Sequence, residues 1–493
     1  TNVSSLTAQR AIADSKNDLA TAMERLSTGS KINSASDDAA GLAMAQRMTA
    51  QIQGLNMAIK NSNDGIAMTK SIEGAIAEVS DMLQRMRELS VQAANGTNSA
   101  SDRTYLQDEV NLLIQEISRV SANTRYNGSL ILDGTFINKQ LQVGIEEGEH
   151  ITFSVDSVAS NQIGAHTLVG EGVQPTAAAT DAAVNPMTTA EDIEIFGYLG
   201  TSLIEASSED TAKETAQKVN LATSETGVRA YAKTFAALSS SDATSRTYNI
   251  KINDYQTGNF VISSTDVGDA VDAINRISGA SGVTAKVENN KVVLFDADGD
   301  DILIENTKAG TDFVDLVVEK LGEDGSASNV VGAAVTLAAS GGNDATRVSG
   351  TLKFVSAMSF SVEQAGDGAD DSTAPKGYFD AGSQTAALMD LTQINIGTEA
   401  GASDAISIID AALDKVAQMR SDLGAIENRM DHTISNLMNI AEKTADSRSR
   451  LQDADFALES ARLAKNQVLQ QAGTSMLSQA NQMSQLVMEL LRG

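Results

Sequence analysis

Histidine is the side chain most often used for metal binding and for proton transfer near neutral pH. The chain has three histidines, His150, His166 and His432. They lie far apart in the sequence, and none belongs to a His-Glu-x-x-His pair, in which two histidines one helical turn apart bind zinc. The sequence therefore disfavours a zinc peptidase, and we expect His432 to lie on the exposed face of a helix.

A second candidate for chemistry is the acidic run Asp296-Ala297-Asp298-Gly299-Asp300-Asp301. It resembles a calcium-binding loop, but it lacks the distant Glu and the ligand spacing of an EF-hand. The alternative is a solvated β-turn, in which Asp and Gly are favoured by the geometry of the backbone. The sequence leaves both interpretations open.

Other kinds of catalytic site are disfavoured by the composition. The chain has no Cys, which excludes disulfides and thiolate chemistry and leaves the redox compartment open. It has no glycine-rich phosphate loop followed by Lys. Carboxylate pairs are uninformative because the chain contains 65 acidic residues. We therefore expect a protein that is not an enzyme and that needs no cofactor and no metal.

The charge of the chain is concentrated in its middle. The net charge is −29, and residues 171–400 contain 34 acidic and 14 basic residues. Such a surface argues against nucleic acid and anionic membranes as partners. No run of 18 apolar residues occurs, so no membrane-spanning helix is expected. Residues 1–10 do not resemble a secretory signal, so export would use another route or follow removal of a signal.

The two terminal segments carry apolar residues at seven-residue spacing, whereas Pro175, Pro186 and Pro375, the three prolines of the chain, lie in the middle. A seven-residue apolar repeat keeps one side of a helix against a partner helix. We therefore expect the termini to pair as one helical stem, with residues from about 170 to 400 inserted as a separate body. The predicted stem residues are Ile12, Leu19, Leu26, Leu469, Met476, Met483 and Leu490.

Long helices are predicted next to the stem. The first helix should end near Leu26, where a polar stretch begins, and the second should start at Ser36-Asp37-Asp38 and reach about Ala94. A third is predicted around 106–120 and a fourth around 409–437, which together suggest a coiled-coil bundle. Alternating apolar residues at 140–143 and 151–155 predict a β-hairpin between them.

The middle of the chain contains an internal repeat. Val219-Asn220, six residues and Gly227-Val228-Arg229-Ala230 match Ile274-Asn275, six residues and Gly282-Val283-Thr284-Ala285. A short amphipathic helix precedes each copy and a strand follows it, which predicts a duplicated helix-strand unit. The expected fold class is therefore a mainly α helix bundle, built by both termini, with an inserted α+β or β-rich outer region.

Three motifs in the terminal regions resemble bacterial flagellin. They are LSTGSKINSASDDAAGLA at 26–43, SRLQDADFA at 449–457 and KNQVLQQAGT at 465–474. They occur in the right order and at the right ends of the chain. The duplicated unit also resembles an insertion that is common in flagellins.

The resemblance implies a structural subunit that polymerises into the flagellar filament and serves motility. It implies a terminal coiled-coil domain (1–40 with 455–493), a helical spoke domain with a β-hairpin (41–170 with 400–454) and variable outer domains (171–399). The implied partners are further copies of the chain, the flagellar type III export machinery and its chaperone, and the filament cap and hook-junction proteins. The implied location is the extracellular filament. The alternative is a flagellin-like hook-associated junction protein, which has similar terminal helices.

The resemblance also implies a host partner. The segment 83–92 resembles the part of flagellin that a Toll-like receptor recognises, so Arg85, Leu89 and Glu109 are the candidate contact residues. The alternative interpretation is that Arg85 and Glu88 lie on a solvated helix face that contacts another subunit. Leu113 stands where receptor-active relatives usually have Arg.

Overall fold

The computed structural model describes residues 3–179, 183–185, 187, 191–242, 244–263, 265–307, 315–338, 343–364, 377–379 and 382–490, with the side chains of 4 and 483–490 excepted. The chain divides into two compact units. Unit 1 contains Thr1–Lys70, Asn138–Ser154 and Leu423–Gly493. Unit 2 contains Ser71–Ile137 and Val155–Asp422. The long helices α2 (Ala39–Ala93) and α8 (Glu399–Gln452) contribute to both units.

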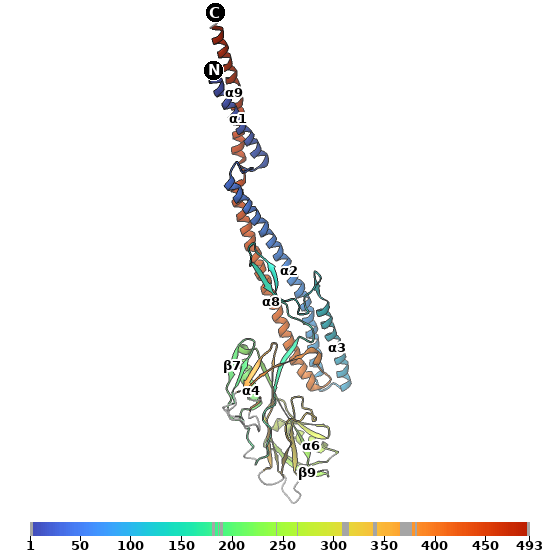
Figure 1. Ribbon diagram of the computed structural model, residues 1–493. Coiled ribbons are helices and arrows are strands. Elements are labelled where there is room, and N and C mark those ends of the chain that lie inside the picture. Colours follow the sequence, from blue (N-terminus) through green and yellow to red (C-terminus); the bar gives the residue numbers. More distant parts are fainter. Residues whose placement is uncertain are drawn as a thin grey trace. The chain divides into compact units, whose positions relative to one another are not determined.

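In unit 1, the terminal helices α1 (Val3–Thr28) and α9 (Phe456–Leu490) lie side by side and antiparallel (Figure 1). Helix α1 ends where Gly29 adopts a φ of +71°, a conformation that favours glycine. Helix α9 begins after Asp455, whose carboxylate accepts the N–H groups of Ala457 and Leu458 at 2.9 and 3.1 Å. The predicted pairing of the two termini is present in the structure.

The rest of unit 1 is the first part of α2, the last part of α8 and a β-hairpin of β3 (Lys139–Gln142) and β4 (His150–Phe153). Helix α2 starts at Asp38, whose carboxylate accepts the N–H of Gly41 at 2.9 Å, close to the predicted start. The two helices share a small core in which Leu55, Ala58 and Leu437 are buried.

Glycine allows the hairpin to approach α2 closely. A Cβ atom on Gly65 would lie 2.6 Å from Leu141 Cδ1 and 2.8 Å from Met430 Sδ, and one on Gly54 would lie 2.7 Å from Ile145 Cγ2. Glycine weakens a helix, so the two residues are better explained by this contact than by helix propensity.

Unit 2 begins with a helical part formed by α2, α3 (Ala100–Asn123) and α8. Three apolar residues of α2 at seven-residue spacing, Ile72, Val79 and Met86, are fully buried. Helix α3 starts with a capping box, in which Ser99 and Asp102 accept each other's backbone N–H groups. Between the helices lie two-residue strands, β1 (Arg125–Tyr126) and β2 (Ser129–Leu130), which pair as a hairpin.

The inserted region of unit 2 consists of strands and short helices. Its strands are β5 (Gly164–Gly170), β6 (Ile193–Phe196), β7 (Thr201–Ile204), β8 (Arg229–Ser240), β9 (Arg246–Ile252), β10 (Tyr255–Ile262), β11 (Thr284–Glu288), β12 (Lys291–Asp296), β13 (Ile302–Asn306), β14 (Leu316–Lys320), β15 (Val335–Leu337), β16 (Ala345–Val348), β17 (Thr351–Ser356), β18 (Ser361–Gln364), β19 (Gly382–Thr385) and β20 (Ala387–Asp390). Its helices are α4 (Ala212–Leu221), α5 (Thr223–Thr226), α6 (Gly268–Asn275), α7 (Ser278–Ser281) and the 3₁₀ turn Leu391–Gln393.

Strand β8 joins the two halves of one sheet of this region. It pairs antiparallel with β17 through its first half, and with β12 and β14 through its second half. This sheet has the order β11-β12-β8-β17-β5-β20, whereas β10-β9-β13-β16 and β19-β18-β6-β7 form separate sheets.

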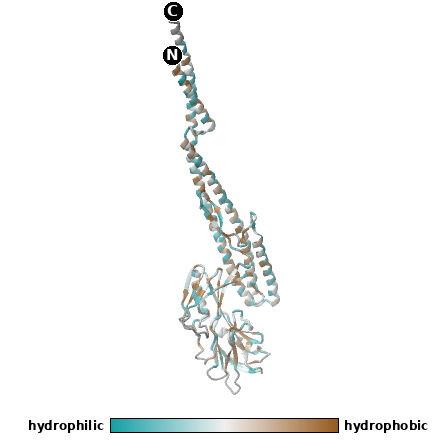
Figure 2. Cartoon of the chain, viewed as in Figure 1, coloured by the Kyte–Doolittle hydropathy of each residue, from teal (hydrophilic) through white to brown (hydrophobic). Residues whose placement is uncertain are grey.

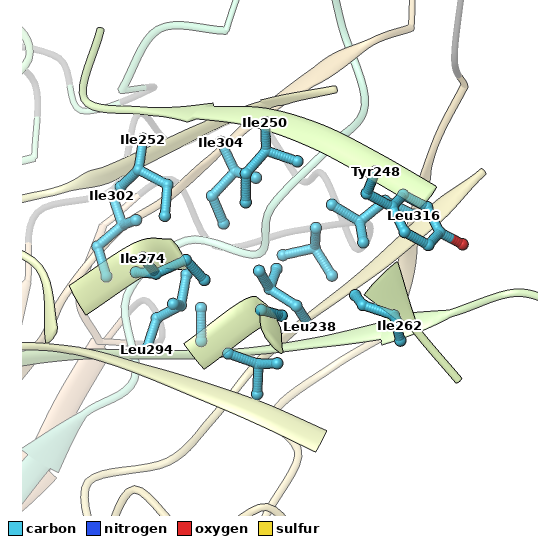
Figure 3. Close-up of a cluster of buried hydrophobic side chains, with 14 of the residues drawn as sticks. Leu238, Tyr248, Ile250, Ile252, Ile262, Ile274, Leu294, Ile302, Ile304 and Leu316 are labelled. Carbon is cyan, nitrogen blue, oxygen red and sulfur yellow. The ribbon is translucent and has the colours of Figure 1, made fainter. Parts of the chain in front are cut away.

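The two larger apolar clusters among the described residues of the inserted region are named here after Tyr248 and Phe354, and a smaller one contains Phe235, Ala237, Val293, Leu321 and Ala327. The Tyr248 cluster includes Leu238, Tyr248, Ile250, Ile252, Ile262, Ile274, Leu294, Ile302, Ile304 and Leu316. Within it, Ile250, Ile252 and Ile304 point toward Ile274 and Leu294 (Figure 3). The Phe354 cluster includes Ile193, Ile195, Val219, Leu352, Phe354, Val362 and Phe379.

The internal repeat is present as a repeated structure. Asn220, at the end of α4, donates to the carbonyl of Ala230 and accepts its N–H, both at 2.9 Å. Asn275, at the end of α6, makes the same two bonds to Ala285, at 2.9 and 2.8 Å. Each helix is followed by one further turn and by a glycine with positive φ, Gly227 or Gly282. The predicted fold class, a terminal helix bundle with a strand-rich insertion, is confirmed.

Candidate assembly interface

On the side of α1 that faces α9, buried and half-buried residues recur with heptad spacing. The buried or half-buried residues of α1 on this side are Ser5, Ala8, Ile12, Ser15, Leu19, Ala22 and Leu26. The alternation of three- and four-residue steps is the pattern of a coiled-coil seam. The predicted residues Ile12, Leu19 and Leu26 all lie in this seam within one chain.

The side of α9 that faces α1 differs from the predicted stripe. Its buried or half-buried residues are Glu459, Leu463, Asn466, Gln470, Gly473, Leu477 and Ala480. Leu469 and Met476 instead flank this seam, with exposed fractions of 45% and 65%. The sequence predicts that this stripe is buried against a helix. Within one chain it is not, because the seam uses small and polar residues that a search for apolar periodicity passes over.

Polar contacts hold both ends of the seam. Ser5 Oγ donates to Asn481 Oδ1 at 3.0 Å near the chain termini. At the opposite end, the carboxylate of Glu459 accepts from Arg25 at 3.3 Å and from Arg462 at 2.9 Å. Glu459 is largely buried, and an ionised carboxylate in such a position needs both cationic partners.

The breaks between α1 and α2 and between α8 and α9 are hydrogen-bonded to each other. The N–H of Lys31 donates to the carbonyl of Gln452 at 2.6 Å, and the N–H of Ala454 donates to the carbonyl of Gly29 at 2.9 Å. Ser30 and Asp453 form an isolated antiparallel bridge between these bonds. Since both chain segments are interrupted at the same level, α1 and α9 are joined to the rest of unit 1 by a paired linker.

Apolar side chains remain exposed on the α1–α9 pair. Figure 2 shows hydrophobic and hydrophilic residues interspersed along both helices. The exposed apolar residues here are Val3, Leu6, Met23, Phe456, Leu458, Val468, Leu469 and Met476. Met483 and Leu490 belong to α9 by their backbone, but their side chains lie outside the described residues. So many exposed apolar residues on one helix pair are typical of a surface that contacts another protein.

The predicted receptor patch is only partly exposed. Arg85 Nε donates to Glu109 Oε1 at 2.9 Å, and Arg85 Nη1 donates to Glu88 Oε2 at 2.9 Å. These carboxylates, Glu88 first, raise the pKa of Arg85, which stays charged. Leu89 is only 1% exposed, because it lies on the buried side of α2. Leu89 therefore offers little surface to a partner in this structure, whereas Arg85 and Glu109 present their side chains to solvent. Leu113 is half-buried.

The carboxylates of the Asp296–Asp301 loop have partners from the chain itself. Asp296 Oδ1 accepts the N–H groups of Asp298, Gly299 and Asp300 at 3.0 to 3.4 Å. The ammonium group of Lys213 lies between Asp298 and Asp300, at 3.1 and 2.8 Å. These bonds favour the turn interpretation over the calcium loop, because Lys213 already pairs with Asp298 and Asp300.

The histidines do not assemble a site. His432 is exposed, as predicted, and His150 and His166 are half-buried. Burial, followed by the charge of Lys415, lowers the pKa of His166. Within the described part of the chain, no three metal-binding side chains come together. The helices described here also include none that is apolar and long enough to cross a membrane.

Comparisons with known proteins agree with these features. Residues 1–137 match the bacterial flagellin N-terminal helical region, and residues 406–491 match the bacterial flagellin C-terminal helical region. The chain is 36% identical to the B-type flagellin of Pseudomonas aeruginosa, over 100% of the chain and 99% of that protein. It is 33% identical to the flagellin of Salmonella typhimurium, again over 100% of the chain and 99% of that protein.

Among solved structures, the FlgL protein of Xanthomonas campestris is 14% identical, with a TM-score of 0.32 over 82% of this chain and 99% of that one. Paired terminal helices, both family matches and identity above 30% over the whole length show that the chain belongs to the bacterial flagellin family and is a structural subunit of the flagellar filament.

Proposed function

We propose that subunits contact one another in the filament through the exposed apolar flank of the α1–α9 pair, which contains Leu469 and Met476. The observation that carries this proposal is the exposure of these side chains beside a seam that is already occupied within the chain. Transfer of apolar surface out of water contributes about 25 cal/mol per Å². A modest contact of this kind becomes decisive in a polymer because every subunit repeats it.

The predicted stem residues then have two different roles. Ile12, Leu19 and Leu26 stabilise the pair within a subunit, since they lie in the seam between α1 and α9. Leu469 and Met476, which continue toward Met483 and Leu490 with heptad spacing, contact the next subunit. Together these residues form the filament core interface in this proposal.

The remaining expectations from the family belong to the same proposal. The chain is divided into a coiled-coil stem (1–40 with 455–493), a helical spoke (41–170 with 400–454) and outer domains (171–399). It has no enzymatic activity. The flagellar type III machinery exports it with the help of a chaperone, and it assembles outside the cell between the hook-junction proteins and the filament cap.

Seeded polymerisation tests the assembly proposal. Met476→Asp should leave the monomer folded, because the side chain is exposed, and should stop filament growth, because a contact between copies would bury an unpaired charge. Thr474→Asp is the matched control on the other flank of the same seam, where Gln467 and Thr474 are also exposed. Normal growth of the Met476→Asp protein, or equal loss of growth with Thr474→Asp, would contradict the proposed surface.

A second candidate function is recognition by a host Toll-like receptor. It is favoured by the exposed pair Arg85 and Glu109, whose side chains are 49% and 44% accessible. Because Leu89 is buried in the described structure, the proposed contact consists of the charged pair without the leucine.

A further inference from the structure

The junction between the two apolar clusters of the inserted region is made of charged and polar groups. Helix α4 contributes to the Phe354 cluster, and β12 and β13 contribute to the Tyr248 cluster. The Asp296–Asp301 loop joins β12 to β13 and contacts α4. The backbone N–H of Lys213 donates to the carbonyl of Gly299 at 3.2 Å, in addition to the ion pairs of its side chain. The loop is therefore a structural link between the clusters.

Asp301 lies at the centre of this junction and is almost inaccessible. Its side chain is 2% exposed, and Oδ2 accepts a hydrogen bond from Asn185 Nδ2 at 2.8 Å. Arg347, on β16, lies 3.7 Å from the same oxygen. Its other oxygen, Oδ1, has no hydrogen-bond partner among the described residues. A buried carboxylate with one oxygen unpaired is destabilised in its charged form.

A buried lysine of opposite charge contributes to the same junction. Lys320, at the end of β14, is 1% exposed, and its Nζ donates to Val173 O at 3.2 Å and to Ser349 Oγ at 3.0 Å. Neither of these acceptors carries a charge. The charged form of the Lys320 amino group is therefore also less stable here than it would be in water.

We propose that the junction is a proton-operated joint, in which the Asp301 carboxyl group and the Lys320 amino group set how firmly the two clusters of the outer region are held together. When both groups are charged, closing the joint buries two poorly compensated charges. When either group becomes neutral, closure costs less.

The direction of each effect follows from proton linkage. Burial raises the pKa of Asp301 from 3.8 to about 6, against the opposing effects of Asn185 and Arg347. Because the closed form holds this proton more tightly than the open form, closure strengthens as the pH falls from about 6 toward 4. The two-unit difference corresponds to roughly a 100-fold change in the closure constant, since each pKa unit is a factor of ten.

Lys320 has the opposite effect on closure. Its titration gives the alkaline limb of the pH dependence, as that of Asp301 gives the acid limb. Burial lowers its pKa from 10.5 to about 7, although the charges of Asp301 and Glu171 raise it. The closed form releases this proton more readily, so closure strengthens as the pH rises from about 7. The joint is therefore weakest between about pH 6 and 7, where both groups are charged.

Two neighbouring ionisable groups, Lys213 and Tyr378, keep one charge state across this range. Asp298 and Asp300 raise the pKa of Lys213 far above neutrality, with Asp300 the stronger, so it stays charged. Burial raises the pKa of Tyr378 well above its usual value, and the charges of Asp301, Asp210 and Glu214 act in the same direction. Tyr378 OH donates to the carbonyl of Asp210 at 3.2 Å and stays neutral. Asp300, which faces Asp301 from the same loop, is held in its ion pair with Lys213.

The test is thermal unfolding of the full-length monomer across pH, with the double variant Asp301→Asn and Lys320→Met beside the parent. Asn and Met imitate the neutral forms, so the Tm of the outer region should exceed that of the parent by several degrees between about pH 6 and 7. The gain should shrink toward both pH 4.5 and pH 9. Hydrogen exchange of α4 and β13 should show the same two-sided profile, which separates opening of the joint from a general change in stability.

Single variants and a control complete the test. Asp301→Asn should remove the acid limb and, because the charge of Asp301 raises the pKa of Lys320, should extend the alkaline limb to lower pH. Lys320→Met should remove the alkaline limb and, because the charge of Lys320 lowers the pKa of Asp301, should extend the acid limb to higher pH. Glu305→Gln, on β13 but paired with Lys251 away from the junction, should give no limb above about pH 6. A Tm difference between double variant and parent that stays constant across pH, or a double variant less stable than the parent throughout, would overturn the proposal.

Discussion

Ile12 on α1 packs against Gly473 on α9, at the middle of the antiparallel pair: a Cβ atom added to Gly473 would lie 2.8 Å from Ile12 Cγ1. Gly473 belongs to one of the motifs that resemble flagellin, and in a helix interior glycine costs about 1 kcal/mol relative to alanine. The close contact with Ile12 explains why α9 has a glycine at position 473 in spite of this cost. The two helices can approach closely at this point because one of them has no side chain there.

The first prediction tests this close approach. Gly473→Leu should separate α1 from α9, because overpacking of a closed contact costs about 1–3 kcal/mol. The expected result is faster hydrogen exchange in both terminal helices of the monomer. Ile12→Ala combined with Gly473→Leu should restore much of the protection, since it frees space opposite the new side chain. Equal protection in parent and Gly473→Leu would show that the pair does not pack as described.

The second prediction concerns the repeated asparagines. Asn220→Ala removes both bonds to the buried residue Ala230, so it should destabilise the outer region by about 1–3 kcal/mol. Asn275→Ala should cost less, because Ala285 is only half-buried. Urea unfolding would measure both. Leu221→Ala, at a neighbouring position that is 85% exposed, is the control and should change stability little.

The third prediction concerns removal of the outer region. The N–H of Leu391 donates to the carbonyl of Ile163 at 3.1 Å, so the two ends of the insertion are adjacent. Replacing 164–390 with a short glycine linker should therefore leave the helices able to fold and the chain able to polymerise. Electron microscopy would show the filaments. A folded, exported deletion variant that forms none would mean that the outer region holds the filament together.

The fourth prediction concerns the proposed receptor contact. Arg85→Ala should weaken binding of the monomer to the receptor ectodomain by about tenfold or more, the usual effect of removing a hot-spot arginine. Arg119→Ala is the control, since Arg119 is equally exposed on α3 but pairs with Glu116 instead. If both variants bind like the parent, the contact lies elsewhere or does not form.

Much of the helical fold could be predicted from apolar spacing. Ile409, Val416, Leu423, Met430 and Leu437 form a heptad column in the sequence, and all five are buried in α8. The start of α2 was also predictable, because the short side chain of an Asp such as Asp38 can accept a hydrogen bond from a free backbone N–H group at the beginning of a helix.

The partner of each stripe was less predictable. The seam of α9 against α1 uses Asn466, Gln470 and Gly473, which carry no apolar signal, whereas the visible stripe with Leu469 and Met476 is exposed. Apolar periodicity predicts that a helix face will be covered. It does not predict whether the covering helix belongs to the same chain or to another copy. Leu89 illustrates the same limit, since a motif match gave no information about its burial.

The assignment of Leu469 and Met476 to contacts between subunits is the central claim, and a cryo-electron microscopy map of the assembled filament at side-chain resolution tests it most directly. The map is expected to show both side chains packed against α1 or α9 of a neighbouring subunit, while Ile12 and Gly473 stay in contact within each subunit. A map in which Leu469 and Met476 face solvent, or in which α1 leaves α9 to pair with another copy, would contradict the account.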